Sequence, residues 1–249
     1  MFGLGTIVNT LAVITGGFLG LFFKKGLKKN VQDILMKGSG IAILFIGISG
    51  VLSYMLTLKD GSFETHGTML LIFSMTLGSL VGELLDIEGK IGQFGQWLRK
   101  FFHAQGDSSF VDGFVHTSLI ICIGAMAIVG SIEDGIHHDI SMLTAKAILD
   151  FVIVLVNASI YGRGTLCAAI PLFLYQGSIT VISSIAGSFA SDLLISQLSF
   201  IGAALIFCIG INTTFGKLLK VGNMLPALFF PVFTLFIGHF IPAVGTFFS

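Results

Sequence analysis

The chain has 249 residues, of which 54% are hydrophobic and only 10% are charged. A soluble domain carries about 25% charged residues, so these few charges cannot cover the surface of a globule in water. Lysine plus arginine and aspartate plus glutamate number 13 each, and this balance argues against nucleic acid as a partner. The composition therefore argues against a soluble enzyme or a disordered chain, and it predicts an all-α protein embedded in a lipid bilayer.

Eight apolar stretches are long enough to cross a bilayer as helices, which takes about 20 residues each. They cover residues 2–23, 40–58, 67–85, 113–132, 142–161, 164–189, 197–215 and 222–247. No soluble domain fits between them, so the sequence predicts a single polytopic transmembrane domain over residues 1–249. The first stretch has neither a basic residue before it nor a small-residue cleavage site after it, which indicates a span rather than a signal peptide.

Lysine and arginine are distributed unevenly among the predicted loops. The loops that follow odd-numbered spans hold eleven of them and the other loops hold two, and cytoplasmic loops carry the positive excess. We therefore expect a multi-pass protein of the bacterial inner (cytoplasmic) membrane with both termini outside. Two of the cytoplasmic loops, 30–37 and 90–102, contain amphipathic segments that are expected to lie flat at the lipid headgroups.

Similar short sequences recur along the chain. GGFLGLFF and GSLVGELL share a glycine pair, at Gly16 and Gly20 in the first and at Gly78 and Gly82 in the second. The motifs ILFIG, LIICIG and LIFCIG follow at residues 43–47, 119–124 and 205–210. These matches predict repeat units 3–58, 67–132 and 164–215, the third of them inverted, and inverted repeats are typical of secondary transporters. Convergent Leu, Ile and Gly composition is the alternative explanation.

Polar residues inside membrane spans are costly, which makes them candidate functional residues. In the fifth span, Lys146, Asp150 and Asn157 lie four and seven residues apart and therefore share one helical face. The sequence leaves two interpretations of Lys146 and Asp150 open. They form either a structural ion pair that locks helix packing or a site that binds a proton or a cation.

The sixth span contains Pro171 and Gly177 in the segment PLFLYQGSIT. Proline removes one helix hydrogen bond, so we expect the helix to be interrupted between these two residues. The freed backbone groups would then form a binding site together with Gln176, Ser178 and Thr180. A kink compensated by neighbouring helices is the alternative.

Two further candidate residues come from other spans. Asn9 in the first span is placed to hydrogen-bond a solute, and Glu83 lies near the cytoplasmic end of the third span. No metal site or cofactor is predicted. The three cysteines are not paired in spacing, and the acidic and histidine residues of the loop 131–141 are typical of a solvated loop.

Several segments carry a family resemblance, namely GTIVNTLAVITGGFLGLFF, GSLVGELLDIEGKI, GAMAIVGSIEDG, AKAILDF and PLFLYQGSIT. In these segments the chain resembles the YqgA/YdfK-like bacterial proteins, a domain-of-unknown-function family, from about residue 3 to residue 231. The resemblance implies an integral membrane protein with transport as the expected role. It implies no substrate and no catalytic residues.

The sequence therefore predicts a secondary transporter of a small solute or ion, not an enzyme. Its expected partners are the lipid bilayer, the solute or ion, and further copies of the chain in a homo-oligomer. The candidate binding residues are Asp150, Lys146, Asn157, Gln176, Ser178, Thr180, Asn9 and Glu83. Two alternatives remain, a channel-forming oligomer with a continuous polar lining and a membrane scaffold or assembly protein that needs only glycine-rich packing faces.

Overall fold

The computed structural model describes residues 3–24, 28–59, 61–123, 125–186 and 191–240. These residues are almost entirely helical, which confirms the all-α class. The chain divides into two compact units that are interleaved in the sequence. Unit 1 comprises residues 1–39 and 90–189, and unit 2 comprises residues 40–89 and 190–249. The borders of these units do not coincide with the predicted repeats.

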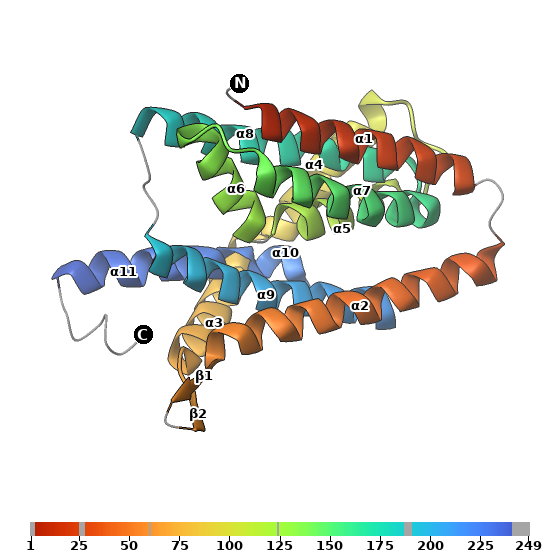
Figure 1. The fold of residues 1–249 in the computed structure, drawn as a ribbon. Helices are drawn as coiled ribbons and strands as arrows, with labels where there is room; N and C mark the ends of the chain where they lie inside the picture. The colour runs from red at the N-terminus through yellow and green to blue at the C-terminus, as the bar shows by residue number, and fades with distance from the viewer. Residues whose placement is uncertain (1–2, 25–27, 60, 124, 187–190, 241–249) are drawn as a thin grey trace. The chain divides into compact units, whose positions relative to one another are not determined.

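Figure 1 shows the elements in chain order. Unit 1 contains α1 (Leu4–Lys24), α5 (Phe110–Cys122), α6 (Ala125–Ile136), α7 (Ser141–Tyr161), the 3-10 helix η1 (Arg163–Ala168) and α8 (Ala169–Ala186). Unit 2 contains β1 (Leu56–Lys59), β2 (Ser62–Thr65), α3 (Thr68–Leu85), α9 (Asp192–Phe215), α10 (Val221–Met224), η2 (Leu225–Phe229) and α11 (Phe230–Phe240). Two helices begin in one unit and end in the other, α2 (Lys29–Met55) and α4 (Ile87–Phe101).

Six helical segments of the described chain are long and apolar enough to cross a membrane. They are α1, α2, α3, α7, α9 and the segment Arg163–Ile185, which joins η1 to α8. The bent pair α5 and α6 adds a seventh if it forms one span. The eighth predicted span corresponds to a shorter apolar segment, Val221–Ile237. The structure therefore supports six to seven of the eight predicted spans.

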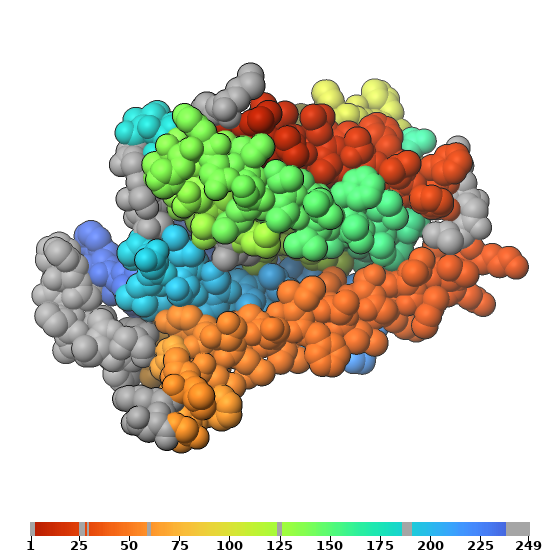
Figure 2. Space-filling model, viewed as in Figure 1, coloured from red at the N-terminus to blue at the C-terminus, as the bar shows by residue number. Residues whose placement is uncertain are grey.

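In unit 1, α1 and α7 run parallel and pack closely along their length. A Cβ added to Gly16 would lie 2.6 Å from the carbonyl oxygen of Phe151, and one added to Gly20 would lie 2.3 Å from that of Leu155. Any side chain at either glycine would therefore push the two backbones apart. Figure 2 shows α1 lying directly against the other helices of this unit.

The second glycine pair has the same role in unit 2. A Cβ on Gly78 would lie 2.3 Å from the amide nitrogen of Ala227, and one on Gly82 would lie 1.8 Å from the carbonyl oxygen of Asn223. The backbone of α3 thus lies against the backbone of α10 and η2. The glycine pairs that the sequence aligns both permit close backbone contact.

The helices of unit 1 alternate in direction. The end of α6 meets the beginning of α1, where the backbone N–H of Gly5 donates to Asp134 Oδ2 at 3.0 Å. The beginning of α5 meets the end of α7, where a Cβ on Gly113 would lie 2.6 Å from that of Tyr161. The α5–α6 pair therefore runs opposite to α1 and α7. This agrees with the predicted topology, in which the fourth span runs in the opposite direction to the first and the fifth.

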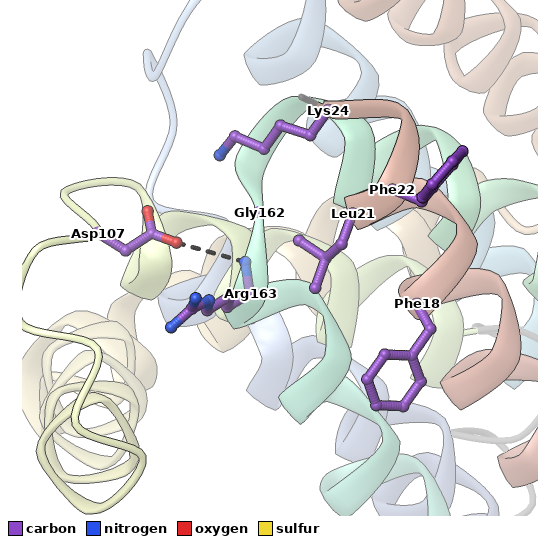
Figure 3. Close-up of a pocket in the computed structure, with 7 residues that line it drawn as sticks. All are labelled: Phe18, Leu21, Phe22, Lys24, Asp107, Gly162 and Arg163. Atoms are coloured by element: carbon purple, nitrogen blue, oxygen red, sulfur yellow. Dashed lines mark hydrogen bonds between the residues drawn. The ribbon is translucent and has the colours of Figure 1, made fainter. Parts of the chain in front are cut away.

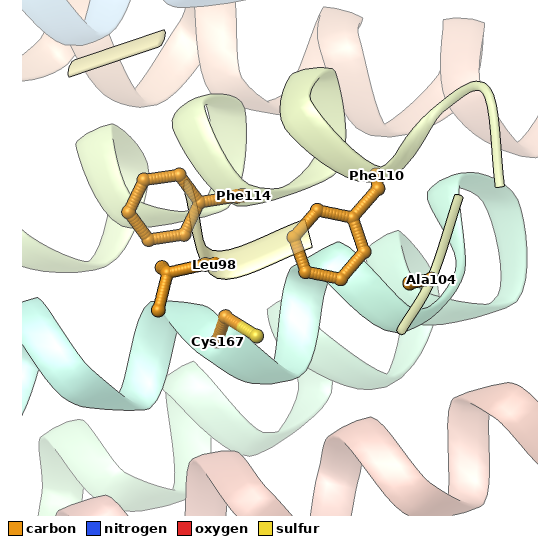
Figure 4. Packing of buried hydrophobic residues seen from close by; sticks show 5 residues of the cluster. All are labelled: Leu98, Ala104, Phe110, Phe114 and Cys167. Carbon is orange, nitrogen blue, oxygen red and sulfur yellow. The ribbon is translucent and has the colours of Figure 1, made fainter. Parts of the chain in front are cut away.

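The structure differs from the prediction for one of the two interfacial segments and agrees with it for the other. Residues 30–37 are not a separate helix, because α2 continues from Lys29 through to Met55. Residues 90–102 fall almost entirely on the amphipathic helix α4, in which Leu98 is buried and the stacked rings of Phe94 and Trp97 are exposed. Figure 4 shows the buried cluster that Leu98 forms with side chains of α5, η1 and the α4–α5 loop, namely Phe110, Phe114, Cys167 and Ala104.

The prediction that the sixth span breaks between Pro171 and Gly177 is wrong. Helix α8 runs without interruption from Ala169 to Ala186 and includes both residues. Pro171 is the third residue of α8, in the first turn, where the backbone N–H groups lack intrahelical partners and a missing donor costs little. The irregular part of this span is the preceding 3-10 helix η1.

A helix break does occur, but within the segment predicted as the fourth span. Helix α5 ends at Cys122, α6 begins at Ala125, and the two axes differ by 61°. The backbone of Ile123 is extended, with φ −84° and ψ 122°, which ends the helical hydrogen-bond ladder. The break sets free backbone groups of α5, and one of them contributes to the candidate site.

Candidate functional site

A buried ion pair lies on α7. Lys146 Nζ is 2.5 Å from Asp150 Oδ2, and the two side chains are only 8% and 4% exposed. The residues are one helical turn apart, so the pair forms within a single helix. The sequence-based expectation that both side chains face the protein interior rather than lipid agrees with this burial.

The broken span supplies a second partner for the lysine. Lys146 Nζ donates to the backbone carbonyl of Ile121 at 2.8 Å. In an unbroken helix that oxygen would accept from the amide of residue 125, but α5 ends at Cys122. The break therefore places a carbonyl dipole beside a buried ammonium group, as discontinuous membrane helices do at ion-binding sites.

Asn9 of α1 connects the ion pair on α7 to Gln176 on α8. Its side chain is fully buried, and its Nδ2 donates to Asp150 Oδ2 at 3.0 Å and to Gln176 Oε1 at 3.2 Å. These bonds join α1, α7 and α8 at one point. Asp150 Oδ2 thus accepts from both Lys146 and Asn9, which stabilises its negative charge.

The network continues along α8. Thr180 Oγ1 donates to the backbone carbonyl of Gln176 at 3.0 Å and lies 3.4 Å from Thr6 Oγ1 on α1. Gln176 and Thr180 are almost completely buried. The structure therefore brings together six polar side chains from α1, α7 and α8, and five of them are predicted site residues.

Two polar atoms of this cluster have no hydrogen-bond partner among the described residues. They are Asn9 Oδ1 and Gln176 Nε2, an acceptor and a donor, and both are buried. A buried polar group without a partner costs about 1–3 kcal/mol, so such groups are rare in proteins and call for an explanation. The cluster thus offers hydrogen-bonding capacity that the protein itself leaves unused.

Three predicted site residues lie outside this cluster. Asn157 is buried, but its Nδ2 donates to Thr117 Oγ1 of α5 at 3.2 Å, two turns from Asp150 along α7. Ser178 is exposed and donates to the backbone carbonyl of Tyr175. It shares α8 with Gln176 but faces away from the cluster.

Glu83 belongs to a separate polar group in unit 2. Its carboxylate pairs with Lys220 and accepts from Asn223 Nδ2 at 2.6 Å. Asn223 Oδ1 in turn accepts from the backbone N–H of Glu88 at 2.6 Å. The hydrogen bond from Lys220 to Glu83 is the main reason why the pKa of Lys220 is raised above its ordinary value. These contacts tie the end of α3 to α10, a structural role.

The sequence-based interpretation missed two members of the cluster. The Ile121 carbonyl became available only through the helix break, and the segment ICIGAMA contains no proline to signal one. In the sequence, Thr6 looks like an ordinary threonine of a membrane helix, whose hydroxyl would be expected to donate to a backbone carbonyl of the same helix. Its position one turn before Asn9 is the only signal that could have identified it.

Comparison with known proteins places the chain in a family. A family model described as "Protein of unknown function (DUF554)" matches residues 4–236. The chain is 33% identical to "Uncharacterized membrane protein YdfK" of Bacillus subtilis (strain 168) over 235 residues, which cover 94% of this chain and 96% of YdfK. It is 25% identical to "Uncharacterized protein YqgA" of Escherichia coli (strain K12) over 229 residues, 90% of this chain and 93% of YqgA.

No solved structure matches the chain significantly. The name of YdfK as a membrane protein agrees with the six to seven apolar helices found here. The family model covers most of the chain, and the relatives align over nearly their full length. The chain therefore belongs to the DUF554 family.

Proposed function

We propose that this protein is a secondary transporter of a small solute or ion, and that the Lys146–Asp150 pair is its coupling site. One observation carries the proposal. A buried ion pair lies beside a helix break, with unused hydrogen-bonding atoms of Asn9 and Gln176 next to it. Buried charges in membrane helices typically mark pathways for ions, protons or solutes.

The geometry suggests how the pair would exchange ions. Asp150 carries one negative charge, and the Lys146 ammonium is its counter-ion. A small cation that binds Asp150 would replace the ammonium in that role. A buried ammonium without a counter-ion is very costly, so Lys146 would then release its proton. The charge of the site stays constant, because one cation enters as one proton leaves.

Comparison of the units supports a functional rather than a structural role. Both units contain a long helix that ends at a glycine with positive φ, Gly162 after α7 and Gly216 after α9. In unit 1 the 3-10 helix η1 and the proline-containing helix α8 follow, and in unit 2 the short helix α10 and the proline-containing 3-10 helix η2 follow. Aligning Asn157 with Asn212 also aligns Pro171 with Pro226 and places Gly162 within one residue of Gly216.

In this alignment Lys146 and Asp150 correspond to Ile201 and Leu205. Those two side chains are fully buried in unit 2. Unit 2 thus has a buried apolar pair where unit 1 has the charged pair. This difference favours a role in binding for Lys146 and Asp150.

The test is an ion-flux measurement on the purified protein in sealed proteoliposomes that carry a pH gradient and a pH-sensitive dye. We expect Na⁺, K⁺ or Li⁺ to dissipate the gradient when the wild-type protein is present. Asp150→Asn protein that is still correctly inserted should show no response. A leak in the absence of added cation would instead favour the channel, and no cation response in wild-type protein would contradict the exchange.

We also propose the predicted orientation in the inner membrane, with both termini outside, in which the α5–α6 pair and the shorter apolar segment Val221–Ile237 each cross the bilayer. It rests on the lysine and arginine distribution and on the alternating helix directions in unit 1. A cysteine at position 249, in a variant lacking Cys122, Cys167 and Cys208, should react with a membrane-impermeant maleimide in spheroplasts with an intact inner membrane. A cysteine in place of Gln96 on α4 should react only after permeabilisation. The opposite pattern would reverse the topology.

A further inference from the structure

A pocket of about 430 Å³ opens in unit 1 where α1 and α7 end, away from the Lys146–Asp150 cluster. Figure 3 shows that its wall comes from the last turns of α1, the α4–α5 loop and the turn that joins α7 to η1. The lining residues are Phe18, Leu21, Phe22, Lys24, Asp107, Gly162 and Arg163.

The charged groups gather around Gly162. A Cβ added to this glycine would lie 2.5 Å from Lys24 Nζ and 2.9 Å from Asp107 Oδ2. Arg163 follows directly, and its backbone N–H donates to Asp107 Oδ2 at 3.3 Å. Gly162 has φ 94°, a left-handed conformation that favours glycine. A glycine here satisfies the backbone conformation and keeps the space between the two charged groups open.

The pocket carries a net positive charge. It contains two cations, Lys24 and Arg163, and one carboxylate, Asp107. Neither the Lys24 ammonium nor the Arg163 guanidinium forms a hydrogen bond or ion pair with a described residue. The Asp107 carboxylate already accepts from the backbone of Arg163 and from Ser109. The two cations are therefore available to a ligand with negatively charged oxygens.

The opposite wall is apolar and open to the surroundings. Phe18 is 61% exposed and Phe22 is 75% exposed, both on the membrane helix α1. In Figure 3 their rings lie on the side away from Asp107. Lys24 is the last residue of α1, and Arg163 comes two residues after α7 ends. Because the ends of membrane-spanning helices lie near lipid headgroups, we place the charged side of the pocket at headgroup depth and the aromatic side toward the acyl chains.

We propose that this pocket binds a phosphate-bearing ligand, with Lys24 and Arg163 holding the phosphate oxygens. Two sources share this chemistry, the headgroup of an anionic phospholipid and a free phosphate ester. Arginine and lysine pair with phosphate through charge-assisted hydrogen bonds. Phe18 and Phe22 give the lipid an additional contact for its acyl chains. The Asp107 carboxylate repels the negative charge of the phosphate, and it can accept a hydrogen bond from a headgroup hydroxyl.

The experiment follows the melting temperature of the full-length purified protein in a neutral detergent, since a ligand that binds only the folded state raises it. The probes are dioctanoyl phosphatidylglycerol, dioctanoyl phosphatidylcholine, glycerol 3-phosphate and inorganic phosphate. We expect phosphatidylglycerol to stabilise the wild-type protein saturably. The variant Lys24→Gln/Arg163→Gln should bind it about tenfold or more weakly, and Lys100→Gln, which removes an exposed charge of α4, should bind it normally.

A second variant is needed because the double variant could lose its response through misfolding, whereas a gain of affinity cannot arise in that way. Asp107→Asn retains an oxygen for the backbone of Arg163 but removes the opposing charge, so it should bind the phosphate probes more tightly than wild type. Equal stabilisation by glycerol 3-phosphate and by phosphatidylglycerol would identify a free phosphate ester as the ligand. The proposal is overturned if no phosphate probe stabilises the wild-type protein, or if the double variant responds as wild type does.

Discussion

Asp150→Asn is expected to lower the free energy of unfolding by about 3–5 kcal/mol, the cost of breaking a buried ion pair by removing one partner. The substitution keeps the size of the side chain but leaves the Lys146 ammonium, which is 8% exposed, without its counter-ion. The bond to the Ile121 carbonyl remains and offsets only part of this cost. Reversible unfolding in mixed micelles, or the shift in melting temperature, measures the effect.

The chain offers a matched control. Asp33 and Lys37 on α2 form an ion pair with the same spacing of four residues, but their side chains are about half exposed, at 52% and 50%. An exposed pair of this kind contributes only about 0.3–0.5 kcal/mol, so Asp33→Asn should be nearly neutral. Similar effects of the two substitutions would mean that Lys146 and Asp150 are not a buried pair.

The double variant Lys146→Ile/Asp150→Leu is expected to fold as stably as wild type and to lose ion exchange completely. It gives unit 1 the residues that unit 2 has at the aligned positions, Ile201 and Leu205. Replacing a buried ion pair by well-packed apolar residues is often neutral or stabilising, by about 1–4 kcal/mol. The melting temperature and the proteoliposome flux, measured on the same preparation, test both parts.

The two parts of this prediction fail in different ways. A double variant that is stable and still exchanges ions would show that the pair is not the coupling site. A double variant that cannot fold would show that unit 1 needs the charged pair for its packing, which would favour the scaffold interpretation. A control is Thr15→Val on α1, because Thr15 is exposed and, among the described residues, donates to backbone carbonyls of its own helix. This variant should leave stability and flux unchanged.

The burial of Lys146 and Asp150 could be predicted from the sequence, because a charged residue in the middle of a membrane helix must avoid lipid. Asn9 and Gln176 could be named for the same reason, but their contact could not. It depends on how α1 packs against α8, and no local sequence pattern specifies the register of that packing. Nothing in the sequence separates Glu83 from the other candidate residues. Its partners Lys220 and Asn223 are far from it in the sequence, and these contacts indicate a structural role.

The position of the helix break could not be predicted. Pro171 pointed to the sixth span, yet proline in the first turn of a helix is tolerated, and the sequence does not show that α8 begins only two residues before Pro171. The true break after Cys122 has no proline. It is stabilised by tertiary contacts such as the bond from Lys146 to Ile121, which a local sequence pattern does not encode.

The central claim is that a cation displaces the Lys146 proton at Asp150. Its most direct test is to add Na⁺, K⁺ or Li⁺ to the purified protein in weakly buffered detergent solution and to measure proton release with a pH-sensitive dye. The proposal predicts release of about one proton per chain by wild-type protein, since the entering cation replaces an ammonium proton, and none by Lys146→Ile/Asp150→Leu. Equal release by the two proteins, or no release by wild type with any of the three cations, would contradict it.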